Sequence, residues 1–185
     1  HASNAAWICE TLGSLVEHGY RLVITHGNGP QVGNLLLLNE SGDPSVPRMP
    51  LDVLVAETEG SLGYFLQQAM LNELKRRGHD RYVMTVVSQV IVDPDDPAFT
   101  NPNKPIGPFL DEVEAVRRRD TMGWIISEDP AGRGWRRMVP SPSPIKVAQW
   151  RMIRESAEAG HIVIACGGGG VPVVVRPDGT FEGVE

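Results

Sequence analysis

Apolar residues near the start of the chain recur at helical spacing and then give way to a short apolar run. Four of them fall on one stripe: Ile8, Leu12, Leu15 and Val16. This stripe predicts an amphipathic helix over residues 5–18. Residues 21–25 then read Arg-Leu-Val-Ile-Thr, which predicts a strand that is buried on both faces.

The same alternation of helical and strand-like stretches continues along the chain. Helical spacing predicts helices that start near residue 30 and that cover residues 52–77, 111–119 and 145–159. Apolar runs predict strands over residues 82–92, 162–166 and 171–175, and a hairpin from residues 124–129 and 135–139. Strands that are joined by long helices indicate βαβ units and a mainly parallel sheet, so the predicted fold class is α/β.

Two segments rich in small residues and proline modify this picture. Residues 93–108 contain five prolines, which predict a stiff, irregular connection. Together with the short helix and the hairpin that follow, it predicts a small subdomain attached to the main sheet. Further on, Ser143 and Pro144 are suited to be the N-cap and first residue of the helix over residues 145–159.

Glycine-rich turns follow two of the predicted strands. Gly27, Asn28 and Gly29 follow the first strand, and Pro30 suits the first position of the next helix. Gly167, Gly168, Gly169 and Gly170 follow the strand over residues 162–166. Ligands of open α/β sheets bind beyond the carboxyl ends of the strands, and a helix start attracts anions. The turns therefore predict an anion site, with a tight connection or a close crossing of two segments as the alternative reading.

Lys104 is the sharpest single candidate for chemistry. It is the one basic residue of the proline-rich segment, where its charge could neutralise a transferring phosphoryl group. The alternative is an ordinary solvated loop lysine. His26 could contact an anion or serve as a scaffold residue. Glu57 and Glu59 fall on different faces of a helix, so they are not expected to form a catalytic pair, and Cys166 is expected to be a small buried hydrophobe.

Composition narrows the classes of partner. The formal net charge is −6 and no stripe of lysine and arginine is visible, so nucleic acid is not an expected partner. No apolar run approaches the length that spans a membrane, so no membrane partner is expected. The two cysteines are too few for a disulfide framework, which favours a reducing, cytoplasmic setting.

Five strings of the sequence resemble those of the carbamate kinases, in the order and with the intervals of that family. They are THGNGPQVG (residues 25–33), PLDVLVAETEGSLGY (50–64), DPAFTNPNKPIGP (96–108), RRMVPSPSP (136–144) and CGGGGVPVV (166–174). The resemblance covers essentially the whole chain. The related kinases of acetylglutamate, glutamate and UMP share the sheet and the glycine turns but lack the strings around residues 26–33 and 101–108.

The resemblance implies a three-layer αβα sandwich of the amino acid kinase type and a homodimer. It divides the chain into an α/β lobe over residues 1–104, a protruding subdomain over residues 105–138, and a return to the lobe over residues 139–185. The implied reaction is reversible phosphoryl transfer between ATP and carbamate, giving ADP and carbamoyl phosphate, with Mg²⁺.

The resemblance also assigns roles to residues. Gly27, Asn28 and Gly29 match the loop that holds the carbamoyl phosphate end. Lys104 matches the catalytic lysine, and Gly167, Gly168, Gly169 and Gly170 match a second turn that lines the site.

The family also has a Gly-Gly-Asn turn and a nucleotide-binding half that these 185 residues do not contain. We therefore expect the chain alone to bind ATP poorly and to have little or no kinase activity. Two alternatives stay open at this stage: a non-catalytic module for anion binding and dimerisation, and a related kinase that acts on another small carboxylate.

Overall fold

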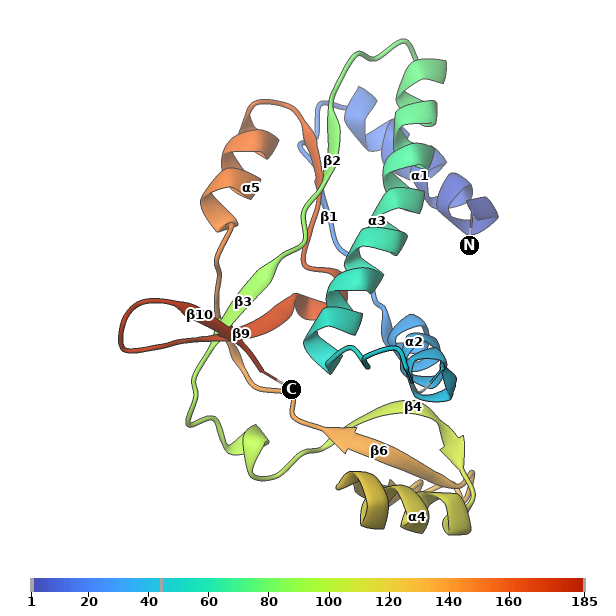
Figure 1. Cartoon of the computed structure of the whole chain (residues 1–185). Coiled ribbons are helices and arrows are strands. Elements are labelled where there is room, and N and C mark those ends of the chain that lie inside the picture. Colours follow the sequence, from blue (N-terminus) through green and yellow to red (C-terminus); the bar gives the residue numbers. More distant parts are fainter. Residues whose placement is uncertain (1, 44, 185) are drawn as a thin grey trace. The chain divides into compact units, whose positions relative to one another are not determined.

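The chain divides into two compact units, each built from segments that are distant in the sequence. A computed structural model describes residues 2–43 and 45–184 (Figure 1). The first unit consists of residues 1–28, 55–90 and 146–171, and the second of residues 29–54, 91–145 and 172–185.

A parallel sheet lies at the centre of the first unit. Its strands are β1 (Val23–Ile24), β8 (Ile162–Ile164) and β2 (Val83–Thr85), in the order β1-β8-β2. Both outer strands run parallel to β8, and Val163 is the partner of Val23 on one side and of Met84 on the other. The predicted parallel sheet is thus confirmed, although its strands are shorter than the apolar runs suggested.

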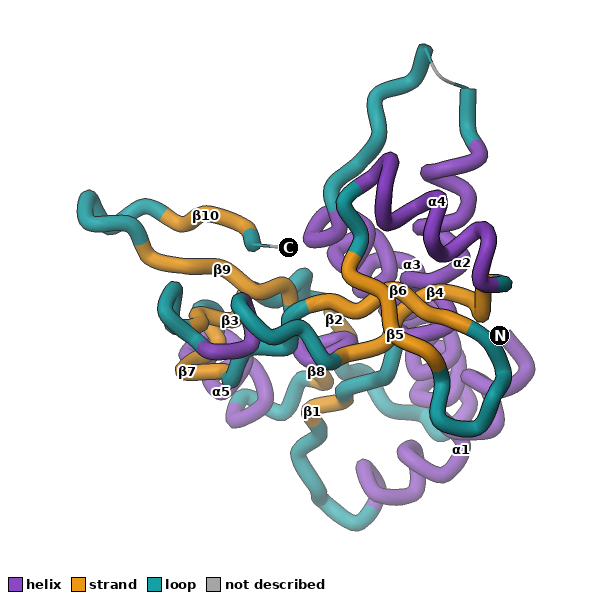
Figure 2. Tube along the Cα trace, turned by 90° about the horizontal axis from the view of Figure 1, so that it is seen from below, coloured by secondary structure: helices purple, strands orange, loops and turns teal. Residues whose placement is uncertain are grey.

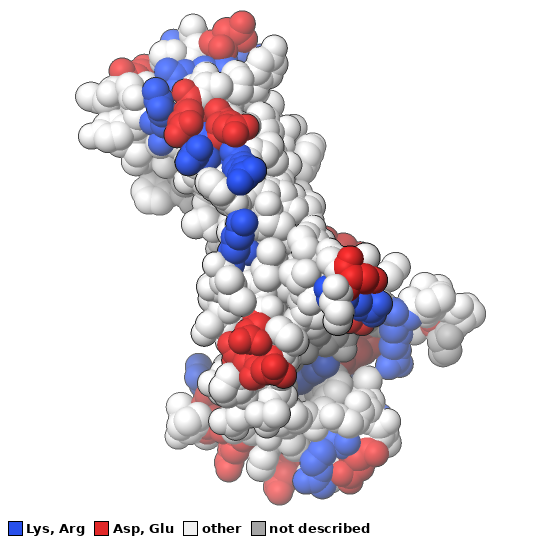
Figure 3. Space-filling view, turned by 90° about the vertical axis from the view of Figure 1, so that its left-hand side faces the viewer, with Lys and Arg blue, Asp and Glu red and all other residues white. Residues whose placement is uncertain are grey.

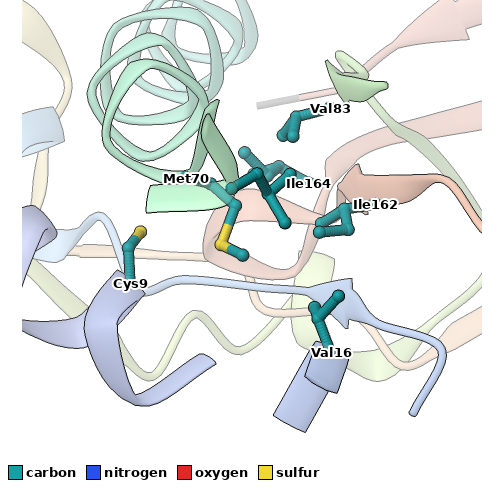
Figure 4. Packing of buried hydrophobic residues seen from close by; sticks show 7 residues of the cluster. Cys9, Val16, Met70, Val83, Ile162 and Ile164 are labelled. Carbon is teal, nitrogen blue, oxygen red and sulfur yellow. The ribbon is translucent and has the colours of Figure 1, made fainter. Parts of the chain in front are cut away.

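Helices cover both faces of this sheet. Side chains of α1 (Ala2–Glu17) and α3 (Leu51–Arg76) pack on Ile162 and Ile164, and Ile153 of α5 (Trp150–Glu158) packs on Val163 and Ala165. Figure 4 shows Cys9, Val16 and Met70 gathered with Ile162 and Ile164. Successive residues of a strand point to opposite faces, so β8 supplies both halves of the core. The result is the expected three-layer αβα arrangement.

A small residue on α3 allows the helix to lie close to β2. A Cβ atom on Gly63 would lie 2.1 Å from Cγ2 of Thr85, whereas one on Gly60 would meet nothing within 4 Å. Gly63 therefore serves packing within the unit.

The second unit contains an antiparallel sheet with two helices. The strands β4 (Lys104–Leu110), β6 (Trp135–Val139) and β5 (Ile125–Glu128) lie in that order, which confirms the predicted hairpin (Figure 2). Helix α2 (Gly29–Ser41) packs on β4, and α4 (Glu112–Met122) contacts β5 and β6. The carboxylate of Asp111 caps α4 by accepting from the N–H of Glu114 at 2.8 Å.

The remaining strands are β3 (Gln89–Val92), β7 (Pro144–Val147), β9 (Val171–Val175) and β10 (Phe181–Gly183). Their order is β10-β9-β3-β7. Two short 3₁₀ turns, η1 (Pro97–Phe99) and η2 (Gly167–Gly169), complete the chain. The single strand predicted over residues 82–92 is therefore two strands in different sheets.

The predicted start of the last helix is wrong. Residues 144–147 form β7, and α5 begins only at Trp150. Backbone pairing explains the difference, because the N–H of Ala148 donates to the carbonyl of Gln89 at 2.8 Å. Ser143 does not cap a helix; its N–H donates to the carboxylate of Asp96 at 2.9 Å.

Charged side chains of both signs are interspersed on the surface seen in Figure 3. Among the described helices, none has both the length and the apolar character that crossing a membrane requires.

Candidate functional site

Two of the predicted turns meet at one edge of the parallel sheet. Strands β1 and β8 are neighbours, so the residues that follow them emerge side by side. Three hydrogen bonds join the two segments. The N–H of Ala165 donates to the carbonyl of Ile24 at 2.9 Å, and the hydroxyl of Thr25 donates to the carbonyl of Cys166 at 2.9 Å. The N–H of Gly168 donates to the carbonyl of His26 at 2.8 Å.

The side chain of Asn28 fixes the first turn to α3. It is 8% exposed, and its Nδ2 donates to Oγ1 of Thr58 at 2.9 Å. The Thr58 hydroxyl in turn donates to the carbonyl of Val55 at 2.6 Å. Asn28 is therefore held by its amide group rather than left free to move in solvent.

Close contacts explain three of the four consecutive glycines. A Cβ atom on Gly167 would lie 2.4 Å from Cε1 of His26, and one on Gly168 would lie 2.2 Å from Nδ2 of Asn28. A Cβ atom on Gly170 would lie 2.3 Å from Cγ2 of Val90. Gly169 has open space but a φ of +100°, which side chains rarely adopt. The close-crossing reading thus accounts for most of this run.

The glycine run uses several of its own N–H groups. The N–H of Gly169 donates to the carbonyl of Cys166 at 3.0 Å, and that of Gly170 donates to the carbonyl of Gly167 at 3.1 Å. Helix α2, by contrast, starts at Gly29, directly after Asn28. The first N–H groups of a helix have no partner within it, so the first turn is the better candidate for an anion receptor.

Ser88 is hydrogen-bonded to the residues at both ends of the glycine run. It is completely buried, and its Oγ accepts from the N–H of Cys166 at 2.8 Å while its carbonyl accepts from the N–H of Val171 at 2.7 Å. Cys166 is half-buried and has a φ of +56°, so it belongs to the turn rather than to the strand where the sequence placed it.

A buried carboxyl group lies against this arrangement. Glu59 is 1% exposed, and its Oε2 accepts from the N–H of Ser88 at 2.6 Å. Among the described residues, no hydrogen-bond partner meets its other oxygen, Oε1. Burial raises the pKa of Glu59 to about 7, and the Ser88 hydrogen bond opposes that rise.

The sequence reasoning placed Glu57 and Glu59 on different faces, and Glu57 is indeed exposed while Glu59 is buried. The position of Glu59 at the site was not predicted, because the two glutamates were considered only as a possible catalytic pair. A signal was available: Glu59 lies four residues after Val55 and three before Leu62, on the apolar face of α3.

Lys104 is exposed and is the first residue of β4, in the second unit. Its backbone pairs with Val139. Its role therefore rests on the sequence resemblance. Over the part of the chain that the structure describes, no group of three or more His, Cys, Asp or Glu residues could hold a metal ion.

No protein-family model matches the chain, but individual proteins do. Carbamate kinase of Pyrococcus furiosus is 51% identical over 176 residues, which cover 94% of this chain and 55% of the relative. Carbamate kinase 1 of Enterococcus faecium is 52% identical over 172 residues, 92% of this chain and 54% of the relative. The chain thus spans about half the length of these curated relatives.

Solved structures show the same similarity. A crystal structure from Aeropyrum pernix K1 superposes with a TM-score of 0.94 at 42% identity, covering 100% of this chain and 59% of that one. Carbamate kinase from Giardia lamblia bound to AMP-PNP gives a TM-score of 0.87 at 38% identity, covering 99% and 58%.

The fold and these comparisons point to one class of protein, the α/β folds that these relatives share. Within that class the chain is similar in sequence and in structure to the carbamate kinases, over nearly all of its own length.

Proposed function

We propose that this chain carries the carbamate-binding part of a carbamate kinase, which transfers a phosphoryl group reversibly between ATP and carbamate. The observation that carries the proposal is the pair of turns after β1 and β8, joined by the bonds of Thr25 and Gly168. Identity of about 50% to carbamate kinases gives these turns their proposed ligand, carbamoyl phosphate.

The reaction requires the protein mainly to align the substrates and to neutralise charge. Carbamate already carries a negative oxygen, so no general base is required, and the remaining tasks are alignment and neutralisation of the phosphoryl charge. In our proposal Gly27, Asn28, Gly29 and the first N–H groups of α2 receive the carbamoyl phosphate end. In the same proposal the turn from Gly167 to Gly170 lies beside the first turn, and Lys104, on the resemblance alone, neutralises charge on the phosphoryl group.

The nucleotide is proposed to be ATP or ADP, in keeping with the AMP-PNP that the Giardia relative binds. Mg²⁺ is proposed to accompany it, since Mg²⁺ usually binds through substrate phosphates with one or two carboxylates. When bound, the ion neutralises phosphate charge. We also propose, from the resemblance alone, a cytoplasmic homodimer in which residues 105–138 form a subdomain.

The experiment is a coupled assay of ATP formation from carbamoyl phosphate and ADP, in the full-length gene product that contains this chain. Lys104→Ala is expected to lower kcat by about a hundredfold or more, as loss of a group that stabilises transition-state charge does. Lys75→Ala is the matched control, because Lys75 is exposed in the last turn of α3. Unchanged turnover by Lys104→Ala would remove that residue from the mechanism, and absence of turnover in the parent protein would contradict the proposed activity.

A further inference from the structure

A buried carboxyl group connects α3 to the glycine run that follows β8. The Cγ atom of Glu59 lies 3.0 Å from the position that a Cβ atom on Gly167 would take, so the carboxyl side chain packs directly against the glycine run. Its Oε2 is bonded to the N–H of Ser88, and its Oε1 is buried with no partner in the described part of the chain.

Ser88 transmits the position of Glu59 to the turn. The hydroxyl of Ser88 accepts from the N–H of Cys166, which precedes the four glycines, and its carbonyl accepts from the N–H of Val171, which follows them. A shift of the Glu59 carboxyl group therefore moves both attachment points of the glycine run together.

The charge state of Glu59 also matters to an anion nearby. Two other titratable groups face the same place: His26, whose ring lies against Gly167, and Cys166, whose thiol has its pKa raised by burial and by the Glu59 charge. An ionised Glu59 would place a negative charge behind the turn at low local dielectric, where repulsion of a phosphate-like ligand is strong. A protonated Glu59 would not.

We propose that Glu59 is a positioning residue that acts through Ser88 on the Cys166–Gly170 turn and that supports anion binding in its protonated form. The ligand in this inference rests on the proposed function, whereas the coupling of Glu59 to the turn does not. Since the pKa of Glu59 is raised to about 7, the protonated form prevails below that pH, and binding weakens as the pH rises through it.

Amide NMR spectra of the 185-residue chain between pH 5.5 and 8.5 test the coupling without any ligand. The N–H signals of Ser88, Cys166 and Gly168 are expected to titrate together with a midpoint near 7 in the parent chain. In Glu59→Gln, whose amide oxygen still accepts from Ser88, this titration should disappear. It should persist in Glu57→Gln, which removes an exposed carboxylate from the same helix, and in His26→Gln, which removes the nearby imidazole.

An unchanged titration in Glu59→Gln, or no titration in the parent chain, would overturn the proposal. If Glu59→Gln does not fold, ¹³C-labelling of glutamate carboxyl carbons in the parent chain measures the Glu59 titration directly. A midpoint near 7 would then support the proposal, and one near 4.5 would overturn it.

Binding of sulfate tests the effect on the ligand, because sulfate keeps its charge across this pH range. The parent chain is expected to bind sulfate about three- to tenfold more weakly at pH 8.5 than at pH 6, and Glu59→Gln to lose that difference. An equal pH dependence in both would overturn the electrostatic part of the inference. If neither chain binds sulfate while the amide titration is present, the positioning role is supported and the proposed anion function fails.

Discussion

At Gly168 the backbone and its neighbours both exclude a side chain. Its φ is +66°, and a Cβ atom there would lie 2.2 Å from the Asn28 amide. Gly179 provides a matched comparison, because its φ is +84° but a Cβ atom there would meet nothing within 4 Å. The pair separates the cost of a left-handed backbone from the cost of collision.

We therefore expect Gly168→Ala to lower the free energy of unfolding by about 3 kcal/mol and Gly179→Ala by only about 1 kcal/mol. Urea unfolding of the two variants against the parent chain measures both losses. Equal losses would mean that the Asn28 side chain yields at no cost, and the tight fit of the turns would then be contradicted.

The residue scale also shows what the sequence could predict about the site. Gly27, Asn28 and the four glycines were singled out because glycine allows backbone conformations that other residues rarely adopt, and their role in anion binding stays a prediction. Ser88 and Glu59 were not found, since a buried serine or glutamate has no signature until the fold brings its partner near. Glu59 could have been singled out only as a charged residue on an apolar helix face.

At the scale of elements, the helices α2 and α4 of the second unit are joined by a charged pair. Arg118 of α4 forms an ion pair with Glu40 of α2, and the two side chains are 13% and 10% exposed. Arg118 also bonds Glu114, and its guanidinium carbon lies 4.8 Å from the centre of the Trp124 ring. Burial raises the pKa of Glu40, and Arg118 opposes that rise, so the ionised form of Glu40 is stabilised by Arg118.

Removing that partner should be costly. Arg118→Ala removes the hydrogen-bonded partner of the Glu40 carboxylate and leaves it only the charges of Arg137 and Arg48, which is expected to lower the free energy of unfolding by about 2 kcal/mol. Arg119→Ala on the same helix removes an exposed ion pair with Asp120 and should cost less than about 1 kcal/mol. Thermal or urea unfolding compares the two. Similar small losses would show that the α2–α4 pair contributes little to this unit.

Elements were predicted well where the periodicity was strong and local. Helices α1 to α4 and the β5–β6 hairpin were confirmed, because their spacing, caps and turns are encoded within a few residues of each other. The predicted start of α5 was wrong because Ser143 and Pro144 fit a helix start locally. The strand that forms there instead is held by a bond between Ala148 and Gln89, which are 59 positions apart in the sequence. Such long-range pairing has no local signal.

At the scale of the whole molecule, the site of the first unit is assembled from four distant segments. Residues 25–28, 58–59, 88 and 166–170 meet because β1 and β8 are parallel neighbours and α3 packs beside them. The sequence predicted the meeting of the two turns from the sheet alone. The contribution of α3 was not predicted, because apolar spacing identifies a helix but does not show where it packs on the sheet.

We propose that the turn after β1 receives the phosphate-bearing end of carbamoyl phosphate. Amide NMR of the 185-residue chain during titration with fresh carbamoyl phosphate tests this proposal, in a buffer free of acetate. A titration with sodium chloride to the same ionic strength is the control. We expect saturable shifts at Gly27, Asn28, Gly29 and Gln31, and none at the start of α1. Saturating ligand that leaves these four amides unmoved, or that moves them no more than the salt control, would contradict it.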